Sequence, residues 1–177
     1  AVSGMQQVTL YQQNGIVQAV LLPNRYKPDR IRVLLSAGSY SGLSHSEIRL
    51  TSSAAFILED KISGLQKKID AGRVLTFQPQ DDGTAVEFSS GQRQLFYNRL
   101  YLNPEEGGQI RIESLRRGSP QFVPSYYGRM EICSRNGGLL LTNEVPLESY
   151  LYSVVPSEMP VGFGAVPLQV QSVAARS

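Results

Sequence analysis

The sequence predicts an α+β protein that is mainly antiparallel β with hairpins, plus two helices near the C-terminus. Two observations predict this fold class. Short runs rich in Val, Ile, Leu, Tyr and Phe recur through the first 145 residues, and Asn-Gly or Asp-Gly pairs separate several of them. After residue 145 the apolar spacing changes from the alternation of a strand to the period of a helix.

Three hairpins are expected, each centred on two residues that tolerate positive φ. They are residues 8–22 around Asn14-Gly15, residues 73–90 around Asp82-Gly83, and residues 128–145 around Asn136-Gly137. Single strands are expected at residues 31–36, 47–52 and 109–114.

A short helix is predicted over residues 60–72, where Ile62, Leu65 and Ile69 share one face and Gly72 provides an end. Residues 101–108 and 116–125 are rich in Gly, Pro and polar side chains, which indicates loops.

Two further helices are predicted near the C-terminus. Pro146 suits a first helical position, an apolar stripe follows, and Pro156 ends the helix because it lacks an amide hydrogen. The second helix opens at Pro167. The first stripe is Leu147, Leu151, Val154 and Val155, and the second is Val166, Val170, Val173 and Ala174. The chain stops at Ser177 within the second stripe, so we expect it to be a fragment of a larger domain.

The composition excludes several functional classes. A net charge of +2 over 177 residues is far from that of a nucleic-acid binder, and the basic runs at 30–32, 67–68 and 116–117 are interpreted as solvated. No apolar run approaches the ~20 residues of a membrane span. One cysteine, Cys133, and one histidine, His45, cannot form a metal site, and no cofactor is indicated. Cys133 is expected to be a buried structural thiol and His45 a solvated loop residue.

Carboxylates are therefore the main candidates for chemistry. Glu148 lies in the first turn of a predicted helix, where its charge is favourable against the helix dipole. Glu158 lies between Pro156 and Pro160, in an apolar setting that would favour the protonated form a general acid needs. Catalysis, an N-cap through Ser157, and a buried hydrogen-bonding role remain open for this segment.

The segment NEVPLESYLYSVVPSEMP, followed after a short loop by LQVQSVAARS, resembles the signature of the sporulation stage II protein D and amidase-enhancer (SpoIID/LytB) family. The resembling positions are Asn143, Leu147, Glu148, Tyr150, Leu151, Val154, Val155, Glu158, Met159, Pro160, Gln171, Val173, Ala174, Ala175, Arg176 and Ser177. The β-rich region before them matches only in character.

The resemblance implies a lytic transglycosylase that cleaves peptidoglycan glycan strands stripped of their stem peptides, with Glu158 as the catalytic acid. It implies substrate-binding roles for Glu148, Tyr150, Met159, Phe163, Gln171 and Arg176. The implied partners are glycan strands and a cell-wall amidase or other wall-remodelling proteins, with no nucleic acid, and with a membrane only through an anchor absent from this chain. The implied location is extracytoplasmic (cell wall, periplasm or intermembrane space), with the protein exported or membrane-anchored.

The chain also departs from the family pattern. A tryptophan is common after the Glu-Met-Pro segment, and here Phe163 either replaces it as a sugar platform or belongs to the core. The family domain continues past the Ala-Ala-Arg segment, so we expect this chain alone to be inactive. We expect two parts: an N-terminal hairpin extension over 1–26 and an incomplete family domain over 27–177. Within the family domain, residues 27–145 are expected to be β-rich and the active-site segment 146–177 helical. Two alternatives to an enzyme stay open: a non-catalytic peptidoglycan-binding enhancer of a wall amidase, and a structural β domain with a vestigial motif.

Overall fold

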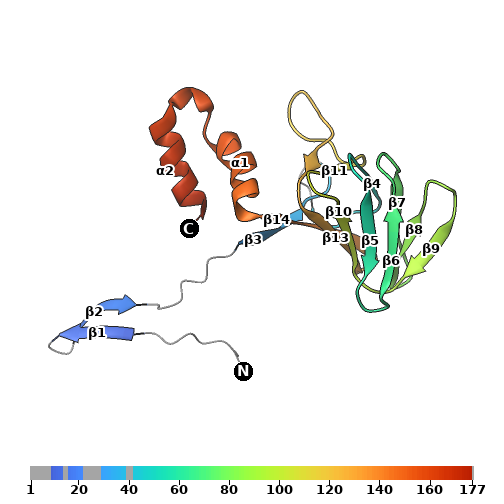
Figure 1. Cartoon of the computed structure of the whole chain (residues 1–177), viewed down its shortest axis with the longest axis horizontal. Coiled ribbons are helices and arrows are strands. Elements are labelled where there is room, and N and C mark those ends of the chain that lie inside the picture. Colours follow the sequence, from blue (N-terminus) through green and yellow to red (C-terminus); the bar gives the residue numbers. More distant parts are fainter. Residues whose placement is uncertain (1–8, 14–15, 22–28, 39–41, 177) are drawn as a thin grey trace.

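Two six-stranded antiparallel sheets share one hydrophobic core and form the body of the molecule in the computed structural model (Figure 1). The structure describes residues 9–13, 16–21, 29–38 and 42–176. The first sheet has the strand order β3-β14-β13-β10-β5-β6 and the second β12-β11-β4-β7-β8-β9. β1 and β2 pair with each other in a separate sheet. The predicted fold class, α+β and mainly antiparallel β, is confirmed.

The elements follow one another along the chain with the helices last. The strands are β1 Thr9–Gln13, β2 Ile16–Leu21, β3 Arg30–Leu35, β4 Ile48–Ser52, β5 Phe56–Asp60, β6 Leu65–Ile69, β7 Leu75–Gln80, β8 Gly83–Glu87, β9 Arg93–Phe96, β10 Leu100–Pro104, β11 Ile110–Ile112, β12 Ser125–Tyr126, β13 Arg129–Arg135 and β14 Gly138–Pro146. The helices are α1 Leu147–Glu158, the 3₁₀ turn η1 Val161–Phe163, and α2 Ala165–Arg176.

The core lies between the two sheets and is built by period-two alternation. In β4 the side chains of Ile48 and Leu50 are fully buried, and in β5 so are those of Phe56 and Leu58, with more exposed residues between them. The members of this core cluster all fall between residues 35 and 141. The helices α1 and α2 therefore contribute nothing to it.

The predicted hairpins are found, but one of their turns is shifted by one residue. Asn136 and Gly137, at φ 52° and 74°, connect β13 to β14 as expected of paired left-handed residues. The β7–β8 turn is Asp81-Asp82 rather than Asp82-Gly83, because Gln80 pairs with Gly83. Gly83 instead belongs to β8, where a Cβ would lie 2.6 Å from the carbonyl oxygen of Phe96. β1 and β2 pair as predicted, while their turn, residues 14–15, lies outside the described residues.

The helix predicted over 60–72 is wrong. β5 extends to Asp60, a turn follows, and β6 covers Leu65–Ile69. The Asp60 carboxylate accepts hydrogen bonds from the amides of Ile62 and Ser63 at 3.0 and 3.2 Å, which fixes the turn. Ile62, expected on the apolar face of a helix, is 80% exposed at this turn.

The single strands predicted at 31–36, 47–52 and 109–114 are confirmed as β3, β4 and β11. The loop predicted over 101–108 is wrong in its first half, because β10 runs from Leu100 to Pro104 between β5 and β13. Pro104, which has no amide to donate, is the last residue of that strand.

Two C-terminal helices are confirmed, with shifted ends. Pro146 precedes α1 as its N-cap instead of being its first helical residue. Pro156 does not end α1, which continues to Glu158 and closes with the Met159 amide donating to the Val155 carbonyl at 2.9 Å. α2 begins at Ala165, and Pro167 lies in its first turn, where the amides lack helical partners in any case.

The two helices form a hairpin beside the sandwich, at the place where β3 and β14 extend beyond it (Figure 1). Only Leu151 and Val155 of α1 are buried, and no residue of α2 is. Neither helix in the described part of the chain has the length and apolar character needed to cross a membrane.

Candidate functional site

Glu158, the predicted acid, is the last residue of α1 and is exposed. Because the helix runs through Pro156, Glu158 ends a helix and does not lie in a separate rigid turn. Because its side chain is exposed, the described residues do not enclose Glu158 in the apolar setting that was expected. The Ser157 hydroxyl donates to the Val154 carbonyl at 2.8 Å, so it does not form the N-cap considered above.

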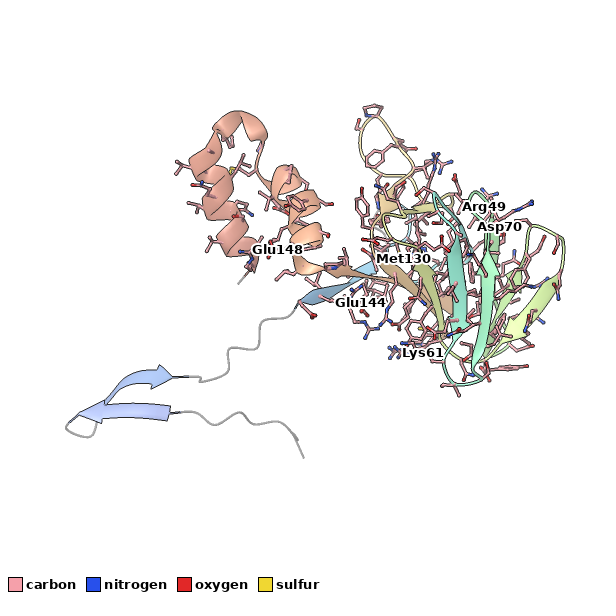
Figure 2. All side chains as sticks on the ribbon, viewed as in Figure 1. Arg49, Lys61, Asp70, Met130, Glu144 and Glu148 are labelled. Carbon is pink, nitrogen blue, oxygen red and sulfur yellow. The ribbon has the colours of Figure 1, made fainter. Side chains whose placement is uncertain are left out.

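Glu148 and Arg176, both implied as substrate-binding residues, contact each other. An Nη2 atom of Arg176 lies 2.6 Å from an Oε1 atom of Glu148, and this ion pair joins α1 to α2. Figure 2 shows Glu148 at the lower end of the helical hairpin. The side chains are 67% and 49% exposed, so the pair adds at most about 1 kcal/mol of stability. Their substrate-binding role stays a prediction.

The other predicted substrate residues lie on the same hairpin. Tyr150, Met159 and Gln171 are half-buried, and Phe163 in η1 is 63% exposed. Of the two interpretations of Phe163, the core reading is therefore wrong, and a sugar platform stays a prediction.

The apolar stripe predicted on the second helix faces solvent. Val166, Val170 and Val173 are 69%, 64% and 64% exposed. The half-buried residues of α2 are instead Pro167, Leu168, Gln171, Ser172 and Ala175. The helix contacts α1 and η1, and its half-buried face is more polar than the predicted stripe.

Asn143 and Glu144, at the start of the family-like segment, hold β14 in place. The Asn143 amide is 5% exposed and donates to the Tyr127 and Arg129 carbonyls at 2.9 and 3.3 Å. Glu144 accepts from Arg129 at 2.7 Å and from Arg30 at 2.9 Å. Burial alone would raise the pKa of Glu144, but the hydrogen bonds and charges of Arg129 and Arg30 outweigh it and lower that pKa.

A groove of about 700 Å³ lies where β14 meets α1. Its lining residues are Arg30, Asn103, Pro104, Glu105, Glu106, Gly107, Gly108, Tyr127, Gly128, Arg129, Glu144, Pro146 and Ser149. Ser149 and Glu144 connect this groove to the family-like segment, whereas Glu158 lies at the other end of α1.

Sequence reasoning missed a buried carboxylate on β13. The Glu131 side chain is 5% exposed and is held between Arg32 and Arg99, with 2.6 Å to Arg99. Arg30 and Arg32 therefore form ion pairs and are not merely solvated, as the short run at 30–32 had suggested. Alternation along β13 places Met130 and Ile132 on the core face and Glu131 on the opposite face, so the local pattern gave no signal for its burial.

His45 is more buried than predicted, and Cys133 is less buried than predicted. His45 is 3% exposed, so its prediction as a solvated residue is wrong: it bridges to Leu139, and its Nε2 donates to the Leu35 carbonyl at 3.0 Å. Cys133 is half-buried, and burial raises the pKa of its thiol. Among the described residues, no three His, Cys, Asp or Glu side chains come together as metal ligands would.

Comparison with known families matches residues 135–177 to SpoIID, described as a stage II sporulation protein. The match covers the end of β13, β14 and the helical hairpin with Glu158, and over this segment the chain is similar to the SpoIID family. No curated protein and no solved structure gave a match. The resemblance seen in the sequence is thus confirmed, for the segment that carries it.

Proposed function

We propose that the protein remodels the bacterial cell wall as a lytic transglycosylase of peptidoglycan strands, outside the cytoplasm, with Glu158 as its acid. The family match over 135–177 carries this proposal, because it includes Glu158, the Met159-Pro160 pair after it and the second helix. The implied site consists of Glu158 with Glu148, Tyr150, Met159, Phe163, Gln171 and Arg176.

The proposed chemistry needs one carboxyl group. Protonated Glu158 donates its proton to the glycosidic oxygen as the bond to the anomeric carbon breaks. The carboxylate then takes a proton from the primary hydroxyl of the same sugar, whose oxygen bonds to the anomeric carbon and closes an anhydro ring. Because water is not the nucleophile, the second carboxylate of ordinary glycosidases is not required.

In the proposed reaction, bound substrate shields the exposed Glu158 from water. A sugar ring placed between Glu158 and the exposed face of Phe163 would supply this shielding. The groove at the β14–α1 junction offers an extended surface for the rest of the strand.

The alternative is a non-catalytic enhancer that binds peptidoglycan or a wall amidase. The exposure of Glu158 favours it, because the described residues do not enclose its carboxyl group as a catalytic pocket would.

The test is incubation of glycan strands lacking stem peptides with the longest form of the protein that contains this chain, and with Glu158→Gln. We expect products with anhydro-muramic ends, detected by mass spectrometry, and their loss in the variant. Absence of cleavage by both proteins, together with retention on insoluble peptidoglycan, would replace the enzyme with the enhancer.

A further inference from the structure

A second cavity, of about 470 Å³, lies at the end of the sandwich away from the helical hairpin. Four segments meet there: the β5–β6 turn, the start of β8, the connection from β9 to β10, and the end of β13. In Figure 2, Lys61 marks this end and lies well apart from Glu148. The residues on which the inference rests are Lys61, Thr84, Tyr97, Arg99, Cys133 and Arg135.

The cavity is cationic. Lys61, Arg99 and Arg135 line it, and no Asp or Glu is among its lining residues in the described chain. Arg99 is oriented by Glu131, but that single carboxylate also neutralises Arg32, so the group keeps an excess positive charge. Arg135 is exposed, and within the described residues it forms no ion pair.

The nearest acidic side chains are engaged or lie outside the cavity. Asp60 is 3% exposed and accepts from the Asn98 amide at 3.1 Å as well as from the turn amides. Asp81 and Asp82 belong to the β7–β8 turn and do not line the cavity. The charge needed to balance the lining cations is therefore absent from the cavity wall.

Aromatic and hydroxyl groups accompany these cations. Tyr97 is 68% exposed at the cavity, and the Nζ atom of Lys61 lies 4.6 Å from the centre of the Tyr101 ring. The Thr84 hydroxyl, on a residue that is 1% exposed, is buried in the cavity wall without a hydrogen-bond partner. Exposed tyrosine faces pack against sugar rings, and guanidinium groups bind carboxylates and phosphates through paired hydrogen bonds.

We propose that this cavity binds an anionic polysaccharide, with Arg99, Arg135 and Lys61 holding a carboxylate or phosphate group and Tyr97 packing on an adjoining sugar. The site is separate from Glu158 and works whether or not the chain cleaves glycan. It gives the β-sandwich a function of its own, which is to hold the chain on a charged polymer.

The first test measures binding by calorimetry at low and moderate salt. The probes are a hexasaccharide of stem-peptide-free glycan, which bears carboxylates, a poly(glycerol phosphate) carrying glucose substituents, and neutral chitohexaose. We expect binding of one or both anionic probes, weakened by salt, and little binding of chitohexaose. Arg135→Ala should weaken it about tenfold, as loss of a charge-assisted hydrogen bond does.

Arg49→Ala is the matched control. Arg49 is an arginine with a 51% exposed side chain, paired only loosely with Glu47 at 3.6 Å, and Figure 2 places it at the opposite end of the sandwich from Lys61. Its replacement should leave affinity unchanged. Equal loss in both variants, or equal binding of chitohexaose or of an oligothymidylate, would overturn the proposal. Stronger binding of glycan or of poly(glycerol phosphate) identifies the source of the anion.

A second measurement uses the lone cysteine as a local reporter. Cys133 lines the cavity, so bound polymer should slow its reaction with a maleimide several-fold. Glu158→Gln should retain this protection in full, and Arg135→Ala should lose it at the same polymer concentration. Protection lost in Glu158→Gln would assign binding to the helical hairpin instead and overturn the proposal, while failure of cleavage alone leaves it intact.

Discussion

Glu131 is the most enclosed ion-pairing carboxylate among the described residues, with 5% of its side chain exposed and an arginine on either side. Glu131→Gln leaves both guanidinium groups without a counter-charge and points an amide donor at one of them. We expect the free energy of unfolding to fall by about 2 kcal/mol. Urea denaturation followed by circular dichroism measures the change.

Glu105→Gln is the control for that variant. Glu105 pairs with Lys68 at 2.8 Å, but the two side chains are 55% and 65% exposed. Its replacement should change stability by less than about 0.5 kcal/mol. Similar losses in the two variants would show that the enclosure of Glu131 does not matter.

His45, the single histidine of the chain, should make stability depend on pH. Burial lowers the pKa of its imidazole below the usual 6.5, the bond to the Leu35 carbonyl opposes this, and the Arg117 charge reinforces it. As pH falls through 6.5, the unfolded chain binds a proton that the folded chain refuses. The contribution of neutral His45 to stability is therefore fully present above that pH. Below it, the free energy of unfolding should decrease by at most about 1.4 kcal/mol per pH unit.

Urea unfolding at several pH values between neutral and mildly acidic conditions measures this slope. His45→Gln should flatten it, even if the variant is less stable throughout. Asp60 and Glu144 cannot mimic the effect: burial raises the pKa of each, but hydrogen bonds outweigh it and lower both below their usual 3.8 and 4.5, so they act only in more acidic solution. A slope that persists in His45→Gln would contradict the assignment.

The sequence motif selected Glu158, Glu148 and Arg176 as candidate site residues, but it did not predict how exposed each one is or what it contacts. The spacing of the motif along the chain is local information, and it corresponds to the succession of α1, η1 and α2 in the structure. Burial depends on what packs against a residue, so neither the exposure of Glu158 nor the enclosure of His45 and Glu131 could be inferred from neighbours in sequence. The basic cavity was missed for the same reason, since Lys61, Arg99 and Arg135 are far apart along the chain.

Among elements, the turn before β13 lies tightly against β14. Gly128 has φ 85°, and a Cβ there would lie 2.3 Å from the Glu144 carbonyl oxygen. Gly128→Ala must displace β14 from β13, so we expect a loss of about 3 kcal/mol or more in the free energy of unfolding. Because β14 leads directly into α1, the Glu148–Arg176 hairpin should shift as well. Chemical denaturation measures the loss.

Gly91→Ala separates steric clash from backbone strain. Gly91 has a nearly equal φ of 82°, but nothing lies within 4 Å of its added Cβ. Only the cost of a left-handed alanine remains, about 1 kcal/mol. Equal losses of unfolding free energy in the two variants would mean that β14 can move away from the added methyl group without loss of stability.

Elements were predictable where their signal is local. Asn136-Gly137 and the alternation around it suffice for the β13–β14 hairpin. Residues 60–72 were misassigned because Ile62, Leu65 and Ile69 fit a helical face, whereas pairing of β6 with β5 exposes Ile62 and buries Ile69. Whether such a segment forms a helix or a strand depends on the strands that pair with it, which the sequence does not show. For this reason the sequence did not predict β10, which pairs with β5 and β13.

At the scale of the whole molecule, the sandwich and the helical hairpin differ in how they are stabilised. The sandwich has a continuous core from Leu35 to Leu141, assembled from strands distant in sequence such as β3 and β14. The hairpin has two buried side chains, Leu151 and Val155, and an exposed ion pair. The division into segments 1–26 and 27–177 stays a prediction.

A chain ending at Pro146 should therefore fold without α1 and α2. It exposes only the parts of β14 and β3 that α1 contacts, which costs about 2 kcal/mol at most. Circular dichroism should show a β spectrum and one cooperative thermal transition. Residues 147–177 alone should be largely unfolded, because helices of 12 residues are marginal in water without tertiary packing. A shortened chain that fails to fold would show that the helices act in forming the sandwich. If it folds and still binds the anionic probes, the two proposed activities reside in separable parts of the molecule.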